Sequence, residues 1–296
     1  MTESQYLTAV YAFGYFGPAR VRLLLSYFGG AKNIWECPEE KLVEVGLPVG
    51  KMSAFAYFRK RFDIEKYFRR LHVLGIRVVT ILDKDYPQNL IDLDGAPSVL
   101  YYKGSLDALK VSSVAIVGSR KMTPYGKEVA EKFSSELSNF GVTVISGLAR
   151  GIDSSAHKAC LNAGGRTVAI LGNGLDIIYP PENLGLSKEI IKAKGALISE
   201  YPLSYPPLPG NFAARNRIIS GLSSAIIVIE GAEKSGTLLT ATHAAEQGKT
   251  LFAVPGPITS PLSAAPLSLI KNGAIMATST KDILDELDRI SGGKTS

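Results

Sequence analysis

One turn of the sequence has residue types suited to binding a phosphate group. Val114–Val117 is a run of apolar, mostly β-branched residues, and it ends in Gly118-Ser119-Arg120. A helical pattern follows over residues 128–137. A strand, a glycine turn and a helix in this order direct backbone N–H groups and the positive end of the helix dipole toward an anion. Because a guanidinium adds bidentate phosphate contacts, the pattern predicts a phosphate site at Gly118, Ser119 and Arg120.

A second segment combines an aromatic ring with amide and guanidinium groups. It reads Asn211-Phe212-Ala213-Ala214-Arg215-Asn216-Arg217-Ile218-Ile219. On a helix, Phe212, Arg215 and Asn216 share one stripe, whereas Arg217 points to another side. A ring that stacks on bases, beside groups that bind phosphates, is what sequence-independent binding of single strands needs. The alternative is that Phe212 belongs to the core and that one arginine bonds a neighbouring loop.

Residues for catalysis or metal binding are scarce. Asp153 and His157 lie four residues apart and could form an acid–base pair, but we interpret Asp153 as a helix N-cap and His157 as a packed residue. His157 and Cys160 have the spacing of two metal ligands, yet no further cluster of Cys or His completes a site. The sequence contains no Walker loop, nucleophile elbow or G-x-G-x-x-G fingerprint. We therefore expect no catalytic residue, no metal and no cofactor.

The elements around these residues alternate between strand and helix. Strands are predicted at 114–117, 142–145, 167–170, 196–199, 225–229 and 250–254, and helices at about 126–140, 153–163, 183–194, 212–222 and 237–247. Runs such as Ala225–Ile229 lack period-two alternation, which indicates strands covered on both faces. The fold class predicted is therefore α/β, with an extended Rossmann-like, doubly wound and mainly parallel sheet.

Four glycine-rich turns follow these strands and should meet at one edge of the sheet, where its ligands bind. They are Gly118–Arg120, Ser146–Gly151, Gly172–Gly174 and Glu230–Thr237. Any one of them could contain glycine for backbone reasons alone. The set, which carries Arg120 and Arg150, favours a phosphate-binding groove that also includes Ser235, Gly236 and Thr237.

The first part of the chain has a different pattern. Residues 1 to about 70 read as short helices, among them Ala19–Phe28, a start near Cys37–Leu42, and the stretch Met52–Leu74. Strands are expected at Arg77–Leu82 and Ser98–Lys103, and a last helix at about 281–290. We predict three parts: a small all-helical domain at 1–72, the Rossmann-like domain at 73–280, and a C-terminal helix and tail at 281–296.

Composition excludes several classes of protein. The 296 residues are 46% hydrophobic and 20% charged, as in an ordinary globular chain. No apolar run is long enough to cross a bilayer, and no secretory leader is evident, so no membrane partner is expected. With only two cysteines, far apart, a reducing cytoplasm is predicted. The net charge is +6, but residues 105–296 carry 19 basic and 16 acidic side chains, so a nucleic-acid site must be a local patch.

Long stretches of the sequence resemble the DNA-processing protein A family (DprA, also called Smf). The resemblance covers roughly residues 75–280, and residues 11–35 are similar to the family's front domain of helix-hairpin-helix type. The matching stretches are Val114–Arg120, Ser146–His157, Gly165–Asn183, Ser199–Pro202, Arg215–Leu222, Ser235–Thr237 and Val254–Pro257, preceded by Asp85–Pro87 and Pro97–Gly104.

The resemblance implies a Rossmann-like protein that binds single-stranded DNA, forms homodimers and delivers the DNA to the RecA recombinase during natural transformation. It implies no catalytic turnover. The family's DNA-contacting arginine corresponds to Arg120, and its pocket to the residues around the R-N-R motif. The expected DNA-binding residues are Gly118, Ser119, Arg120, Arg150, Asn211, Phe212, Arg215, Asn216, Arg217, Ser235, Gly236 and Thr237.

The chain departs from the family pattern at three places. Pro209 stands where some members carry a DNA-binding lysine, so we expect weaker affinity or support from Arg150. Ala213 replaces a usual proline. The sequence runs to Ser296, so we expect no winged-helix domain of the kind that many members carry.

Two other functions fit parts of the pattern. One is a nucleoside-monophosphate phosphoribohydrolase of the "lonely guy" type, whose catalytic glutamate is replaced here by Thr240. The other is a sensor that binds a small nucleotide in the same groove. A dimer contact is predicted in the later part of the Rossmann-like domain, with Ile258, Leu262, Leu267, Leu269 and Ile270 as candidates, although a core role suits them equally well.

Overall fold

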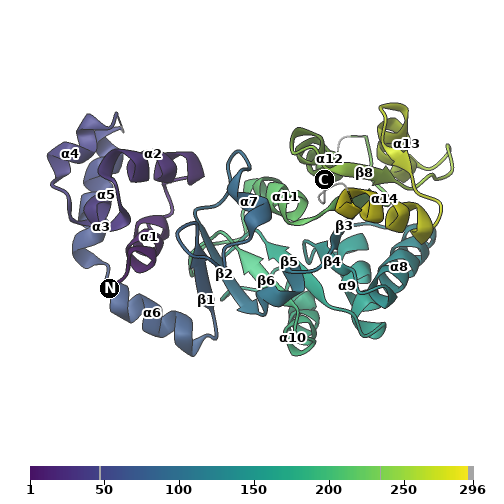
Figure 1. Cartoon of the computed structure of the whole chain (residues 1–296), viewed down its shortest axis with the longest axis horizontal. Coiled ribbons are helices and arrows are strands. Elements are labelled where there is room, and N and C mark those ends of the chain that lie inside the picture. The colour runs from purple at the N-terminus through teal and green to yellow at the C-terminus, as the bar shows by residue number, and fades with distance from the viewer. Residues whose placement is uncertain (47, 234, 293–296) are drawn as a thin grey trace. The chain divides into compact units, whose positions relative to one another are not determined.

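The computed structural model describes residues 1–46, 48–233 and 235–292, which form two compact units (Figure 1). Unit 1 contains residues 1–103 together with 173–176 and 199–206, and unit 2 contains the remaining residues from Gly104 onward. The domain limits proposed from the sequence, at 72 and 280, stay predictions. The compact units are divided differently because unit 1 takes in two segments from the second half of the chain.

Unit 1 begins with short helices. They are α1 (Glu3–Ala12), α2 (Pro18–Phe28), α3 (Ala31–Glu36), α4 (Glu39–Glu44), α5 (Val49–Arg61) and α6 (Ile64–Val73). The stretch 52–74 forms parts of two helices, because Asp63 caps a new helix by accepting a hydrogen bond from the backbone N–H of Lys66. After them, β1 (Arg77–Thr80) pairs antiparallel with β2 (Val99–Gly104), and α7 (Gln88–Ile91) lies between the two in sequence.

Unit 2 has a parallel sheet, as predicted. Its strands lie in the order β6-β5-β4-β3-β7-β8-β9. Their bounds are β3 (Ser113–Val117), β4 (Thr143–Ser146), β5 (Thr167–Leu171), β6 (Ala196–Ser199), β7 (Ala225–Val228), β8 (Thr250–Ala253) and β9 (Ile275–Met276). Val114 pairs in parallel register with Val144 on one side and Ala225 on the other. All five residues of β3 are buried, which explains why this strand lacks alternating polarity.

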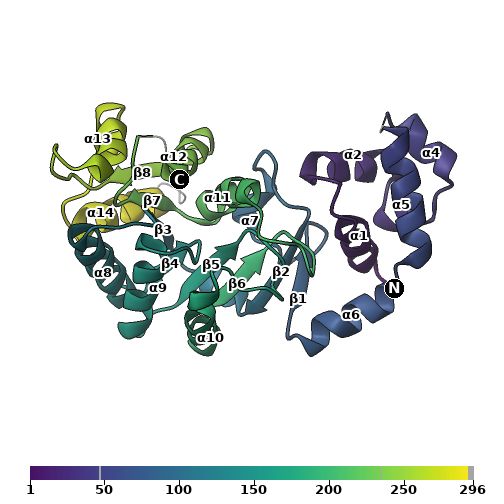
Figure 2. The same ribbon diagram turned by 180° about the vertical axis from the view of Figure 1, so that it is seen from behind.

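Helices cover both faces of this sheet (Figures 1 and 2). Those of unit 2 are α8 (Pro124–Asn139), α9 (Ile152–Asn162), α10 (Leu184–Lys192), α11 (Pro209–Leu222), α12 (Gly236–Glu246), α13 (Ala264–Lys271) and α14 (Thr280–Gly292), with 3-10 turns at Leu106–Leu109, Pro181–Asn183 and Pro261–Ser263. Side chains of α8, α9 and α14 share one core with Val114 and Ile116 of β3. Helices α11 and α12 pack against each other on the other face. The doubly wound α/β class is thereby confirmed.

Three findings bear on the chemistry expected. Within the described ranges, no helix has the length and apolar character to span a membrane. Among the same residues, no three His, Cys, Asp or Glu side chains gather closely enough to hold a metal ion. Both cysteines, Cys37 and Cys160, are free thiols.

Candidate nucleic-acid interface

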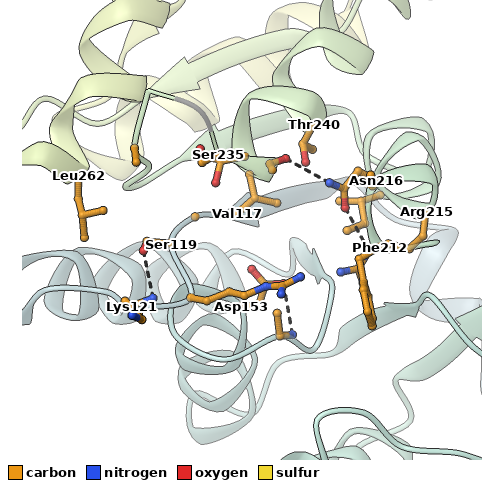
Figure 3. Close-up of a pocket in the computed structure, with 18 of the residues that line it drawn as sticks. Val117, Ser119, Lys121, Asp153, Phe212, Arg215, Asn216, Ser235, Thr240 and Leu262 are labelled. Carbon is orange, nitrogen blue, oxygen red and sulfur yellow. Dashed lines mark hydrogen bonds between the residues drawn. The ribbon is translucent and has the colours of Figure 1, made fainter. Parts of the chain in front are cut away.

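A pocket of about 540 Å³ lies at the carboxyl ends of the strands of unit 2 (Figure 3). It brings together four of the predicted segments: the turn after β3, the turn after β4, the N-terminal half of α11 and the start of α12. The predicted residues that line it are Gly118, Ser119, Arg120, Phe212, Arg215, Asn216, Ser235, Gly236 and Thr237. Arg150 instead lines a smaller depression beside it. Asn211 and Arg217 line neither cavity.

The turn at 118–120 is held by close backbone packing. A Cβ atom on Gly118 would lie 2.7 Å from the side chain of Ile152, and one on Gly151 would lie 2.2 Å from the carbonyl oxygen of Ser119. Gly151 also has φ of +73°, a conformation that favours glycine. The backbone N–H of Ile152 donates to the carbonyl of Ser119. The start of α9 therefore fixes the turn that presents Arg120.

Arg120 and Phe212 meet at this pocket. The guanidinium carbon of Arg120 lies 5.4 Å from the centre of the Phe212 ring, within the range of a cation–π contact. The Arg120 side chain is exposed, while Phe212 is half-buried and so is not a closed core residue. Lys121 adds a second cation to the lining. A half-buried ring can stack on a base through its open face, and the two cations beside it can bind a phosphate.

Arg215 occupies a different position from the one expected of a DNA contact. Its side chain is buried, with 4% of its surface exposed. Its Nη1 donates to the carbonyl oxygens of Gly147 and Ile170, and its Nε donates to Oδ1 of Asn216. This guanidinium fastens α11 to the ends of β4 and β5. Arg215 is thus the arginine that bonds a neighbouring loop, which was the alternative that the sequence pattern left open.

Asp153 is not the helix N-cap that we predicted. Gly151 takes that position, and Asp153 lies in the first turn of α9. Its buried carboxylate accepts hydrogen bonds from the backbone N–H groups of Gly147 and Ala149. Burial raises the pKa of Asp153, and the nearby Arg215 guanidinium opposes this. The carboxylate thus organises the turn after β4.

His157 is a packed residue, as predicted. It is fully buried, and its Nδ1 lies 2.7 Å from the hydroxyl of Thr167. Burial, together with the positive charge of Arg215, lowers the pKa of His157 to about 3. The imidazole is therefore neutral at physiological pH.

The start of α12 also lines the pocket. Ser235 is its N-cap residue and Gly236 its first residue. In the part of the chain that the structure describes, the buried hydroxyl oxygen of Ser235 has no hydrogen-bond partner. The side-chain amide of Asn216 donates to the carbonyl of Gly236 and so ties α11 to α12. Free N–H groups at a helix start, beside a serine hydroxyl, can bind an anion.

Three residues in or near the site have contacts that sequence reasoning did not foresee. Pro209, the position of the absent lysine, is the first residue of α11 and lines the pocket. Tyr179 packs against Phe212 with ring centres 5.4 Å apart. Glu230 accepts hydrogen bonds from the backbone N–H and the hydroxyl of Thr123, which caps α8. Tyr179 could have been found from the sequence, because it lies within a stretch that resembles the family.

Known proteins share both the sequence and the fold of this chain. A sequence model of the DNA recombination-mediator protein A family matches residues 77–288. Protein Smf of Escherichia coli is 42% identical over 246 residues, which make up 83% of this chain and 66% of that protein. The crystal structure of DNA processing protein A from Streptococcus pneumoniae is 34% identical and superposes with a TM-score of 0.83, over 97% of this chain and 99% of that one.

A second solved structure, DNA processing protein A from Helicobacter pylori, is 30% identical with a TM-score of 0.64, and covers 72% of this chain and 96% of that one. The Helicobacter protein has a unique single-stranded DNA binding mode. The family match spans more than half of the chain, and the relatives agree with it in sequence and in fold. This chain therefore belongs to the DNA recombination-mediator protein A family, whose members are named DprA or Smf.

Proposed function

We propose that this chain binds single-stranded DNA in the pocket of unit 2 and does not cut it. The observation that carries the proposal is the contact between Arg120 and Phe212 at a pocket that the start of α12 also lines. The Helicobacter relative, which binds single-stranded DNA, supports it. Arg120, Ser119 and the 235–237 turn would bind phosphates, and Phe212 would stack on a base. Such contacts are ionic and independent of sequence.

The test measures the affinity of an oligothymidylate for Arg120→Ala over a range of salt concentrations. The control is Arg166→Ala, which removes an exposed arginine directly before β5, at the opposite edge of the sheet. Loss of one phosphate contact should weaken binding and reduce the slope of log K against log salt by about 0.7. If Arg120→Ala bound as tightly as Arg166→Ala at moderate salt, the site would be assigned wrongly.

The wider biological role is part of the same proposal. We infer that the chain protects incoming single strands in the cytoplasm during natural transformation, acts as a homodimer, and loads RecA onto the DNA. Membership of the family supports this role, although the aligned part spans only 66% of the length of E. coli Smf. Ile258, a candidate dimer contact, is 89% exposed. Light scattering should give twice the chain mass of 31.7 kDa at micromolar concentration, and a lone 31.7 kDa species would refute the dimer.

Binding of a free nucleotide is the second candidate, and the size of the pocket favours it. A volume of about 540 Å³ lies within the range of small-molecule sites. A thermal-shift screen that compares free nucleotides with short oligonucleotides distinguishes the two functions, because the true ligand raises the melting temperature more. Hydrolysis has less support, because Thr240 lines the pocket where a phosphoribohydrolase would need a carboxylate. Release of adenine from AMP would overturn the proposal of a binder without turnover.

A further inference from the structure

The aromatic surface of Phe212 continues into Tyr179, which follows β5. The two ring centres lie 5.4 Å apart with 31° between their planes. Tyr179 is 38% exposed, so part of its ring is available to a ligand. It lines the smaller depression with Arg150 and Pro180, and Phe212 lines both this depression and the main pocket. A strand bound at Phe212 therefore meets a second ring directly beside the first.

The depression beside Tyr179 is too small to enclose a base. Its volume of about 20 Å³ is far below the roughly 300–1,000 Å³ of pockets that enclose a small ligand. A second base can only lie over the exposed part of the Tyr179 ring. Stacking of this kind is tolerant of sequence, since every base has a π face.

A cation lies at the same place and is held by a carboxylate. The Nε of Arg150 donates to Oε1 of Glu182 in an ion pair whose side chains are 56% and 47% exposed. An exposed ion pair contributes little to stability. The guanidinium can therefore exchange Glu182 for a phosphate, to which its planar fork is well matched.

We propose that Tyr179 and Arg150 form a second nucleotide subsite, in which a base stacks on Tyr179 and the adjoining phosphate displaces Glu182 from Arg150. This inference rests on the proposed function, because the first nucleotide occupies the pocket at Phe212. The subsite makes the protein a binder of oligonucleotides in preference to mononucleotides. Through this subsite, the same pocket would bind single-stranded DNA more tightly than a free nucleotide.

The first test compares thymidine monophosphate with oligothymidylates of two, four and six nucleotides, each competing with a labelled strand. Tyr179→Ala should weaken binding of the hexamer about tenfold and leave binding of the monophosphate unchanged. Tyr179→Phe should keep the parent's affinity, since stacking needs the ring and not the hydroxyl. Phe140→Ala is the matched control: it removes an exposed ring at the end of α8, ahead of β4.

The outcomes separate the two proposals. If Tyr179→Ala bound the hexamer as tightly as the parent did, or lost affinity equally for the monophosphate, the subsite would be refuted while the pocket stood. If the parent bound no oligomer at all, the proposed function would fail, and the subsite with it.

The second test concerns the carboxylate that competes with DNA. Glu182→Gln removes the negative charge beside Arg150, so affinity for the hexamer should rise severalfold, with no change for the monophosphate. Arg150→Ala should lower hexamer affinity selectively. Glu131→Gln, which removes the carboxylate of the half-exposed ion pair with Lys127 in α8, is the matched control. Equal hexamer affinities for Glu182→Gln and the parent would refute the exchange of Glu182 for phosphate.

Discussion

Replacement of Arg215 by methionine should destabilise unit 2 far more than replacement of the other arginines of α11 and its pocket. Methionine retains an unbranched apolar stem but removes the guanidinium that donates to the carbonyls of Gly147 and Ile170. Hydrogen bonds from a charged group contribute about 1.5–3 kcal/mol each. The variant also leaves the buried Asp153 without its neighbouring cation. Release of the arginine from burial offsets part of the loss, so we expect a net cost of about 3 kcal/mol.

Thermal unfolding followed by circular dichroism measures this cost. For a domain of this size, about 3 kcal/mol corresponds to a drop of roughly 6–12 °C in melting temperature. The comparison variants are Arg120→Met, whose side chain is exposed, and Arg217→Met, whose Nη1 donates to the carbonyl of Ala214 one helical turn away. Each should lower the melting temperature by only a few degrees. If Arg215→Met melted with the parent, its guanidinium would not be the fastening that we describe.

Three further predictions concern single positions. Gly151→Ala should displace the turn at 118–120 and lower both melting temperature and DNA affinity, whereas Gly164→Ala, with φ of +76° in open space, should affect stability alone; equal affinities would contradict this. Thr123→Val removes the cap of α8 and a donor to Glu230, and should cost about 1–2 kcal/mol in urea unfolding, with Thr123→Ser close to the parent. The pKa of His157 is lowered to about 3 in the fold, below its unfolded value of 6.5, so the unfolded chain takes up a proton first as the pH falls. The free energy of unfolding should therefore decrease between pH 6.5 and pH 3, by up to about 1.4 kcal/mol per pH unit. His157→Gln should make that decline shallower, and identical pH profiles would exclude a neutral buried imidazole.

Strands β3 to β7 were predictable because they are buried on both faces, whereas the exposed β9 was not predicted. Val114–Val117 and Ala225–Ile229 show this in their composition, and both lie where expected. The N-terminal helices were harder to predict, because their limits depend on caps rather than on apolar period. Asp63 divides the stretch 52–74 by capping α6, a role that its position within an apolar pattern does not reveal.

The meeting of the predicted turns at one pocket could be foreseen from the sequence, but the contacts of their side chains could not. Parallel strands bring their carboxyl ends to one edge whatever the side chains are, so the turns bearing Arg120 and Ser235 had to converge. Asp153 was assigned to a cap because it is an aspartate near a helix start. In the fold, α9 begins one residue earlier, at Ile152, so Gly151 is the N-cap. The Asp153 carboxylate instead accepts a hydrogen bond from the backbone N–H of Gly147 in the preceding turn.

Arg215 shows that helical period predicts the direction of a side chain but not its burial or its contacts. The period places Phe212, Arg215 and Asn216 on one stripe of α11 and thus gives them a common direction. The helical period does not predict how deeply each side chain is buried. The ring of Phe212 stops half-buried at the pocket, whereas the longer arginine chain reaches the main-chain carbonyls at the strand ends. Exposure and hydrogen-bond partners, rather than residue type, therefore decide which arginine of this pocket can bind a phosphate. Arg120 has an exposed side chain that is available to one, whereas the buried Arg215 fixes the helix that carries Phe212.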